Sequence, residues 1–137
     1  MKYLVVLACV VVAAVASHLP NLPENERLKL AQVHRDCQAD PKTYVDEDKL
    51  RKLPNFVEDK QVGIHMRCMA VKSGLMKQNG DLDIPSITQK FGLVIKDHSK
   101  VNGFVQQCAK KADTPEKTAI LLTLCCVKND IQYYHKL

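Results

Sequence analysis

The sequence predicts an all-α fold, a single domain of about six helices. Composition favours helices over sheets, because the 137 residues include no tryptophan, few aromatic residues and only five glycines. The stretch from Thr114 to Tyr134 predicts the central helix of the domain. Every residue from Ala119 to Val127 except Thr123 is apolar, and a helix that is apolar on nearly all sides is buried among other helices.

The N-terminal residues predict export. Lys2 is followed by an unbroken apolar run, Leu4 to Val15, and by small residues before Ser17, which is the pattern of a secretory signal peptide. We therefore divide the chain into a signal peptide, residues 1–16, and one helical domain, residues 17–137. A membrane anchor is the less favoured alternative, because the run is shorter than the roughly 20 residues that span a bilayer. The protein is expected to be secreted and extracellular.

Cysteine content agrees with secretion. Secretion would place the thiols in an oxidising environment, where disulfides persist. Five cysteines follow the signal peptide, and because this number is odd, at most two bridges form within the chain. Spacing alone does not decide which cysteines pair. The five cysteines that follow the signal peptide are Cys37, Cys68, Cys108, Cys125 and Cys126.

Two helices are expected in the N-terminal part of the domain. The first runs from about Glu24 to Gln38 and ends before Pro41. A short second helix begins near Asp46 and ends by Leu53, because Pro54 cannot continue it. The inward face of the first helix is predicted to consist of Leu30, Val33, His34 and Cys37.

The third helix, about Glu58 to Ser73, has two apolar stripes on nearly opposite sides. One stripe comprises Ile64, Cys68, Val71 and Leu75, and the other comprises Val62, Met66 and Met69. Two stripes indicate a helix that is covered on two sides, one by packing and the other by a cavity. Methionine favours the second stripe as the cavity wall, because its flexible thioether adapts to varied shapes. The alternative is that both stripes are core.

Three more helices are expected in the C-terminal half. After a turn at Lys77–Asp81, the fourth helix begins near Asp83 and the fifth near Asp97. The last helix begins at Thr114-Pro115-Glu116, which combines a hydroxyl cap, a proline in the first turn and an acid. The apolar faces are Ile84, Ile87, Phe91 and Val94 in the fourth helix, and Val101, Phe104, Val105 and Cys108 in the fifth.

No motif predicts an enzyme, and neither catalytic residues nor a cofactor are expected. The run Cys125–Asp130 is similar to the catalytic helix of secreted phospholipases A2, but Asn129 stands where their base is a histidine. The five histidines are spread along the chain without ligand spacing, so no metal site is expected. The lysines are scattered and lack interleaved aromatic residues, so nucleic acid is not expected as a partner.

The cysteine pattern resembles that of insect odorant-binding proteins of the pheromone-binding and general odorant-binding (PBP/GOBP) type. That family has six cysteines, with three residues between the second and the third. With Cys37 as the first and Cys68 as the third, the second falls at Ile64 and is missing here.

The C-terminal cysteines show a matching gap. The family has eight residues between its fifth and sixth cysteines. With Cys108 as the fourth and Cys126 as the sixth, the fifth falls at Lys117 and is also missing. These two cysteines bond to each other in the family, so their joint absence removes one whole bridge. This pattern is typical of the minus-C subclass.

The resemblance implies two disulfides, Cys37–Cys68 and Cys108–Cys126, with Cys125 as a free thiol. Because Cys125 and Cys126 are adjacent, the residues themselves leave open which of the two forms the second bridge. The implied fold is an odorant-binding-protein-like domain in which six helices, linked by two disulfides, enclose an apolar cavity.

The function that the resemblance implies is extracellular transport. Such a protein binds and solubilises a small apolar ligand, an odorant, pheromone or similar semiochemical, in an internal pocket. An olfactory receptor is a further implied partner, and the protein would be a monomer or weak homodimer. The helical faces predict that the ligand contacts Val62, Met66, Met69, Leu75, Phe91, Phe104, Leu124 and Tyr133.

The positive charge favours one alternative, a membrane-active or lipid-presenting helical protein of the saposin-like or antimicrobial kind. Such a protein needs an exposed apolar face with lysines along its rim. The polar strip of the last helix, which includes Lys117 and Lys128, is too narrow for that arrangement.

Overall fold

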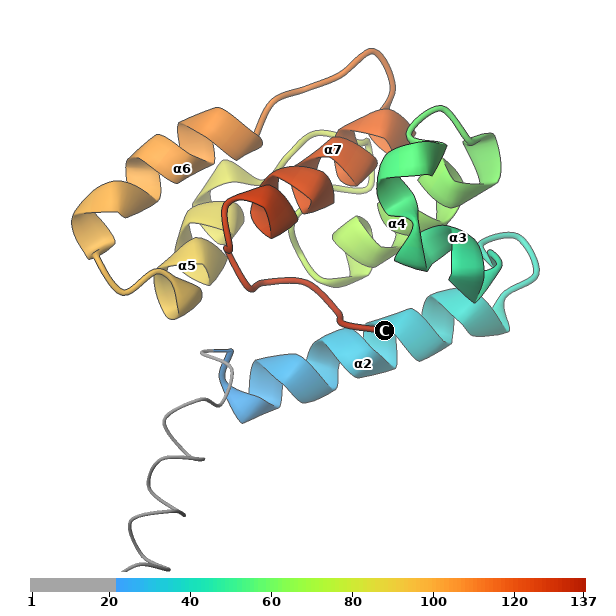
Figure 1. The fold of residues 1–137 in the computed structure, drawn as a ribbon, viewed down its shortest axis with the longest axis horizontal. Helices are drawn as coiled ribbons and strands as arrows, with labels where there is room; N and C mark the ends of the chain where they lie inside the picture. Colours follow the sequence, from blue (N-terminus) through green and yellow to red (C-terminus); the bar gives the residue numbers. More distant parts are fainter. Residues whose placement is uncertain (1–21) are drawn as a thin grey trace, which may run out of the picture.

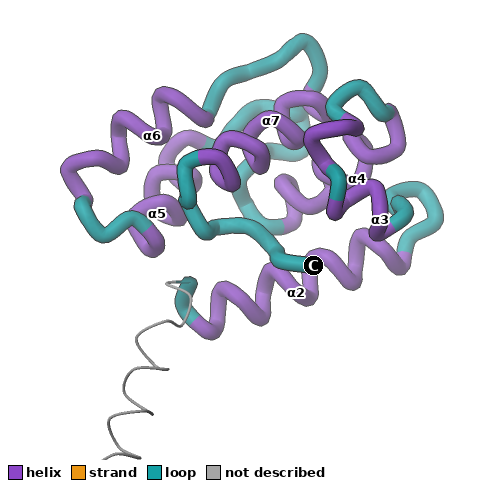
Figure 2. The backbone as a smooth tube through the Cα atoms, viewed as in Figure 1, coloured by secondary structure: helices purple, strands orange, loops and turns teal. Residues whose placement is uncertain are grey.

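A computed structural model describes residues 22–137, so the expected signal peptide lies outside the described residues. Within this range the chain is helical, and its one extended pairing is an isolated bridge between Met76 and Leu82 (Figure 2). The predicted all-α fold with six α-helices is therefore confirmed. The elements are α2 (Glu24–Ala39), α3 (Glu47–Arg51), η1 (Leu53–Phe56), α4 (Lys60–Lys72), α5 (Ile84–Val94), η2 (His98–Lys100), α6 (Val101–Cys108) and α7 (Pro115–Lys128), where η marks a 3-10 helix.

Four of the six α-helices begin at side chains that cap them. Asp46, Asp59 and Asp83 each accept a hydrogen bond from a backbone N–H in the first turn of α3, α4 and α5. Thr114 does the same for α7, and Pro115 then occupies the first turn. A cap satisfies a backbone donor that has no partner inside the helix, so these residues fix where the helices start.

The last helix is shorter than predicted, because it ends at Lys128 and does not continue to Tyr134. Asp130 has a φ of 55°, in the left-handed region that aspartate enters more readily than most residues. The Ile131 N–H then donates to the Cys126 carbonyl at 2.8 Å, the long-range hydrogen bond of a Schellman cap. The remaining tail leaves α7 and crosses to α2, where the chain ends (Figure 1).

Helix α7 lies at the centre of the fold, as its apolar run predicts. It contacts α4, α6 and η1, with α4 on one side of it and α5 and α6 on the other, while α2 lies across the tail (Figure 1). The burial is not uniform, because Leu121 and Val127 are exposed. The buried residues of α7 are Thr118, Ala119, Ile120, Leu122 and Cys126.

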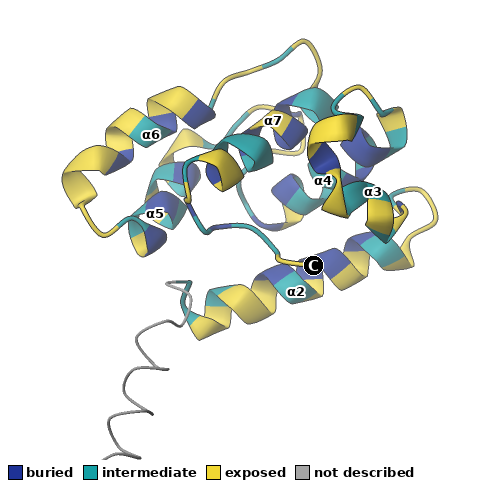
Figure 3. Ribbon diagram, in the orientation of Figure 1, coloured by how far each residue is buried: buried dark blue, intermediate teal, exposed yellow. Residues whose placement is uncertain are grey.

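The apolar faces predicted for α2, α5 and α6 are largely confirmed, and their opposite faces are exposed (Figure 3). The stripe of Ile64, Cys68, Val71 and Leu75, which begins in α4, is only half-buried. In α5 only Ile84 departs from the prediction, because it is exposed at the start of the helix. In α6 Phe104 is half-buried, and the other three predicted residues are buried. The buried residues of α2 are the four predicted ones, Leu30, Val33, His34 and Cys37.

A glycine allows α4 and α7 to approach closely. A Cβ atom added to Gly63 of α4 would lie 2.7 Å from the Cβ of Glu116, in the first turn of α7. Real Cβ atoms do not approach so closely, so only glycine permits this separation of the helices. Arg67, one turn further along α4, donates a hydrogen bond to Glu116 at 3.1 Å across the same contact.

The two disulfides join α2 to α4 and α6 to α7. Cys37 is bonded to Cys68, the pairing that the resemblance implies. The second implied pairing is wrong, because Cys108 is bonded to Cys125, and Cys126 is the free cysteine among the described residues. Adjacent helical residues point about 100° apart. Cys125 points toward the end of α6, whereas Cys126 is 2% exposed and belongs to the main apolar core.

This pairing moves the position of the missing bridge. If Cys125 corresponds to the sixth cysteine of the family, the eight-residue spacing leads back to Glu116 and not to Lys117. Ile64 and Glu116 line the same two surface hollows beside the α4–α7 contact, whereas Lys117 lines one of them. Lys117 instead binds Glu58 at 2.7 Å.

The close approach of α4 and α7 yields a first prediction. Gly63→Ala should lower the free energy of unfolding by about 1–3 kcal/mol, because the added methyl group must push the helices apart. Gly103→Ala is the matched control: no atom lies within 4 Å of a Cβ placed there in α6, so alanine should stabilise the helix by roughly 0.5–1 kcal/mol. Urea unfolding of both variants measures the difference, and equal effects would contradict the proposed contact.

A second prediction concerns the missing bridge. Ile64→Cys together with Glu116→Cys should form a third disulfide and raise the unfolding free energy under oxidising conditions, by up to about 4 kcal/mol for a loop of this size. The control is Ile64→Cys together with Lys117→Cys, which should leave both thiols free. Thiol titration and thermal melting with and without reductant test this. A bridge in the control pair alone would restore the assignment of Lys117.

Candidate functional site

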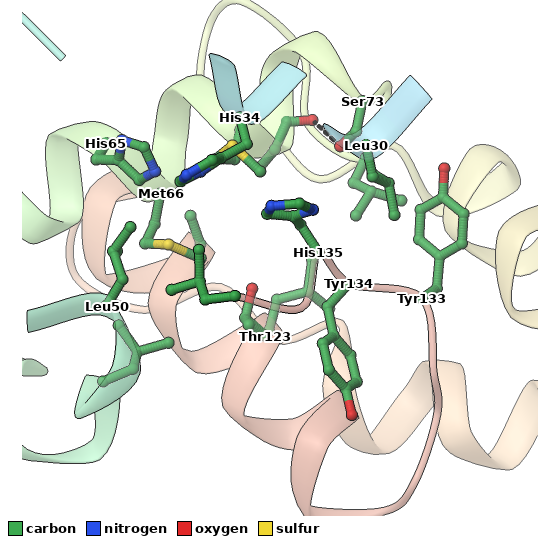
Figure 4. A pocket seen from close by; sticks show the side chains of 17 residues that line it. Leu30, His34, Leu50, His65, Met66, Ser73, Thr123, Tyr133, Tyr134 and His135 are labelled. Carbon is green, nitrogen blue, oxygen red and sulfur yellow. Dashed lines mark hydrogen bonds between the residues drawn. The ribbon is translucent and has the colours of Figure 1, made fainter. Parts of the chain in front are cut away.

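A cavity of about 100 Å³ lies between α2, α4, α7 and the C-terminal tail (Figure 4). Its walls are mainly apolar. Leu30 contributes from α2, Leu50 from α3, and Ala119 and Leu122 from α7. A small, mostly apolar cavity inside a helical protein is a site that an apolar molecule can fill.

Four of the eight predicted ligand contacts line this cavity. Met66 and Met69 belong to the α4 stripe predicted to face a cavity, and Leu75 lies just beyond the same helix. Tyr133 reaches the cavity from the tail rather than from the last helix. These four residues remain candidate ligand contacts.

The structure places the other four predicted residues elsewhere. Val62 is fully buried in a separate core cluster, and Leu124 packs against that cluster. Phe91 is fully buried in the main core between α5, α6 and α7, and Phe104 packs against it. None of the four lines the cavity.

The face that α7 presents to the cavity follows from the disulfide. Leu124 would face the cavity if Cys126 formed the bridge, whereas the bond to Cys125 turns the helix so that Thr123 and Leu122 face it. The difference of one residue is a rotation of about 100°. The wrong prediction of Cys126 as the bonded cysteine therefore also led to the wrong α7 residue, Leu124, being predicted to face the cavity.

Three histidines that the sequence analysis considered scattered come together at one end of the cavity. His65 lies beside Met66, and His34 lies between His65 and His135 (Figure 4). The rings of His34 and His135 stack with their centroids 4.6 Å apart, and the His65 ring lies edge-on to His34 at 5.6 Å. Sequence spacing carries no signal of this cluster, because its members come from α2, α4 and the tail.

Each buried imidazole is positioned from its own side of the site. His34 Nε2 bonds to Glu47 Oε1 at 2.7 Å, and Gln38 donates to the same oxygen at 3.0 Å. The hydrogen bonds from Gln38 and then His34 lower the pKa of Glu47, so this carboxylate is charged. His65 Nδ1 donates to the Thr43 carbonyl at 3.0 Å. Within residues 22–137 no group of three or more histidine, cysteine or acidic side chains could hold a metal ion.

Burial sets the protonation of two members of the cluster. Desolvation lowers the pKa of His65, which is 1% exposed, and the adjacent His34 lowers it further. Desolvation also lowers the pKa of His135, again with a contribution from His34. Both imidazoles are therefore neutral at neutral pH.

A buried ion pair holds the tail over the cavity. Glu26 of α2 accepts hydrogen bonds from Tyr133 Oη and from Lys90 Nζ, both at 2.7 Å, and the Lys90 and Glu26 side chains are each 13% exposed. Burial raises the pKa of Glu26, but the bonds from Lys90 and Tyr133 outweigh it, so the pKa is lowered. Burial and the Glu26 charge raise the pKa of Tyr133. Downstream of this anchor, Tyr134, His135 and Leu137 form one wall of the cavity.

The fold and the cavity define the class: a small all-α protein, linked by two disulfides, with a mostly apolar cavity between its helices. The model of the PBP/GOBP family matches residues 21–129, and the chain belongs to this family. Two relatives from Tenebrio molitor, the B1 protein and the B2 protein, are each 21% identical over 113 residues. The alignments cover 82% of this chain and 87% and 88% of the relatives.

No solved structure matches the chain significantly. Among the described residues, no helix is both long enough and apolar enough to span a bilayer. Family membership supports a role as the carrier of a small ligand.

The histidine cluster predicts how stability depends on pH. The pKa values of His65 and His135 are lowered in the folded protein from 6.5, so the unfolded chain takes up protons first as the pH falls. The free energy of unfolding should therefore be nearly constant between about pH 7 and pH 8 and decrease below about pH 6.5. A second decrease should begin near pH 4.5, where the unfolded chain protonates Glu26 and Glu47, whose folded pKa values are lowered.

Urea unfolding at pH 7.5 and pH 5.5 measures the first decrease. His65→Asn should reduce the difference between the two pH values, because it removes one of the buried imidazoles. His98→Asn is the control, since His98 is exposed on η2, and it should leave the difference unchanged. Stability that rises between pH 7.5 and pH 5.5 would contradict the assignment of His65 and His135 as neutral groups.

Proposed function

We propose that the protein is a secreted carrier that binds and solubilises one small apolar ligand in the cavity between α2, α4, α7 and the tail. The observation that supports this most strongly is the cavity itself, a partly open space of about 100 Å³ whose walls are mostly apolar. Membership of the PBP/GOBP family supports the same role. The proposal includes cleavage of residues 1–16 and a mature domain of residues 17–137.

Burial alone can provide the affinity. A ring-sized ligand that loses about 200 Å² of apolar accessible surface gains about 5 kcal/mol, which corresponds to submillimolar binding when ordering costs are small. A ligand that buries about 300 Å² gains about 7 kcal/mol, close to micromolar. The larger ligand needs more room than this cavity offers, so Tyr134 and His135 would have to move aside.

The remaining parts of the proposal concern partners. The protein acts as a binding protein and not as an enzyme, and it carries an odorant, a pheromone or a similar semiochemical. Delivery to an olfactory receptor, and a monomeric or weakly dimeric state, belong to the same proposal. Displacement of an environment-sensitive apolar dye by a panel of volatile and non-volatile apolar compounds tests the central claim. Absence of any dye binding or displacement would reject it.

The methionines supply the prediction for this site. Met66→Ala and Met69→Ala should each weaken dye binding by about threefold or more, because each removes several buried methylene-sized contacts from the cavity wall. Val71→Ala is the matched control on the other stripe of α4, where Val71 is half-buried and lines an outer hollow instead of the cavity.

The control should lower the free energy of unfolding by about 1–2 kcal/mol and leave the order of ligand affinities unchanged. Dye titration and urea unfolding of all three variants separate the two effects. If the methionine variants lose stability and keep full affinity, the cavity wall has been misassigned, and the Val71 stripe becomes the better candidate for ligand contact.

A further inference from the structure

The cavity is not apolar throughout, and one polar atom at its histidine end has a defined role. His65 Nδ1 lies 3.0 Å from the carbonyl oxygen of Thr43. A carbonyl oxygen only accepts hydrogen bonds, so Nδ1 must carry the proton. In a neutral imidazole the other nitrogen, Nε2, is then an acceptor with a free lone pair.

Burial keeps the imidazole of His65 in this neutral form, because desolvation lowers its pKa. Nε2 forms no hydrogen bond within residues 22–137. It is not among the fully buried side-chain atoms without a partner, so it retains some accessible surface. His65 is 1% exposed and lines the cavity, so we assign the surface that Nε2 retains to the cavity side. The cavity therefore contains an acceptor that the protein itself leaves unpaired.

The neighbouring charges decide which ligand group suits this acceptor. His34 Nε2 lies 2.7 Å from Glu47 Oε1, so a carboxylate contacts the imidazole that neighbours His65. A ligand carboxylate would be repelled by Glu47 and by the lone pair of His65, and an ether or ester oxygen would place one acceptor against another. A hydroxyl group is neutral and donates, so it satisfies Nε2 at no cost in charge.

We propose that the ligand of this cavity carries a hydroxyl group, which donates a hydrogen bond to His65 Nε2 while the apolar body of the ligand fills the space between Met69, Ala70 and Leu122. This inference rests on the proposed carrier function and specifies the ligand class for the same site. The imidazole of His34 lies next to His65, and that of His135 stacks on the other side of His34 (Figure 4). The protein is thus a carrier of small alcohols or phenols rather than of hydrocarbons, ethers or acids.

A matched set of single-ring compounds tests this, because the cavity volume of about 100 Å³ suits one small ring. p-Cresol and p-xylene differ only by a hydroxyl in place of a methyl group, 4-methylanisole keeps the oxygen without the O–H, and p-toluate supplies the carboxylate. Each compound is tested for displacement of an apolar dye from the purified protein at pH 8, where p-cresol and His65 are neutral. We expect p-cresol to bind about threefold to tenfold more tightly than each of the others, the range given by one net hydrogen bond.

Two variants assign the preference to His65. His65→Asn retains an N–H near the position of Nδ1 for Thr43 and leaves no acceptor at the position of Nε2, so the ratio of p-cresol to p-xylene affinity should fall to about one. Binding of p-xylene should persist in this variant. His98→Asn, at an exposed site on η2, should keep the full ratio.

The outcomes separate the two proposals. Equal displacement by p-cresol and p-xylene, tightest binding of p-toluate, or a preference that survives His65→Asn would overturn the hydroxyl assignment while the carrier function stands. Displacement by none of the compounds would overturn the carrier function and the hydroxyl assignment with it. If His65→Asn does not fold, the comparison of the four compounds on the parent protein still decides the outcome.

Discussion

The rotation of α7 about its own axis is the constraint on which the rest of the structure depends. Two contacts fix it: the bond from Cys108 to Cys125 near its C-terminal end, and the approach of Glu116 to Gly63 in its first turn. With these contacts in place, Cys126 must point into the main core, and Leu122 and Thr123 must point into the cavity. A bridge to the adjacent cysteine would turn a different set of side chains toward every neighbour of this helix.

The end of α7 decides how the cavity is closed. The left-handed Asp130 terminates the helix and directs the tail toward α2, where Tyr133 binds Glu26. Removing a partner from a buried ion pair leaves a charge without compensation, so the Glu26–Lys90 pair holds the tail firmly at Tyr133. Only after this anchor does the chain place His135 on His34 and complete the wall of the cavity.

Local chemistry made part of this structure predictable from the sequence. Caps such as Asp83 and Thr114 act on neighbouring backbone groups, so helix starts are visible in the chain. Helical spacing likewise identified Met66 and Met69 as one face of α4. Which of Cys125 and Cys126 bonds to Cys108 depends on where the end of α6 lies in space. The sequence around two adjacent cysteines on one helix does not give that position. The end of α7 was missed because aspartate, and not glycine, occupies the left-handed position.

The histidine cluster could not be predicted either, because its members come from segments that are far apart in the sequence. The same origin explains why one wall of the cavity is weakly held. The three rings come from α2, α4 and the tail. His34 and His65 meet where α2 packs against α4, and His135 joins them because the tail is anchored at Tyr133. Downstream of that anchor, within residues 134–137, the tail forms no hydrogen bond and rests on apolar contacts and the His34–His135 stack. Burying neutral imidazoles has a desolvation cost that burying aliphatic side chains does not have. The last four residues are therefore held less tightly than Tyr133, so the fold combines a firmly held framework with one weakly held wall at the polar end of its cavity.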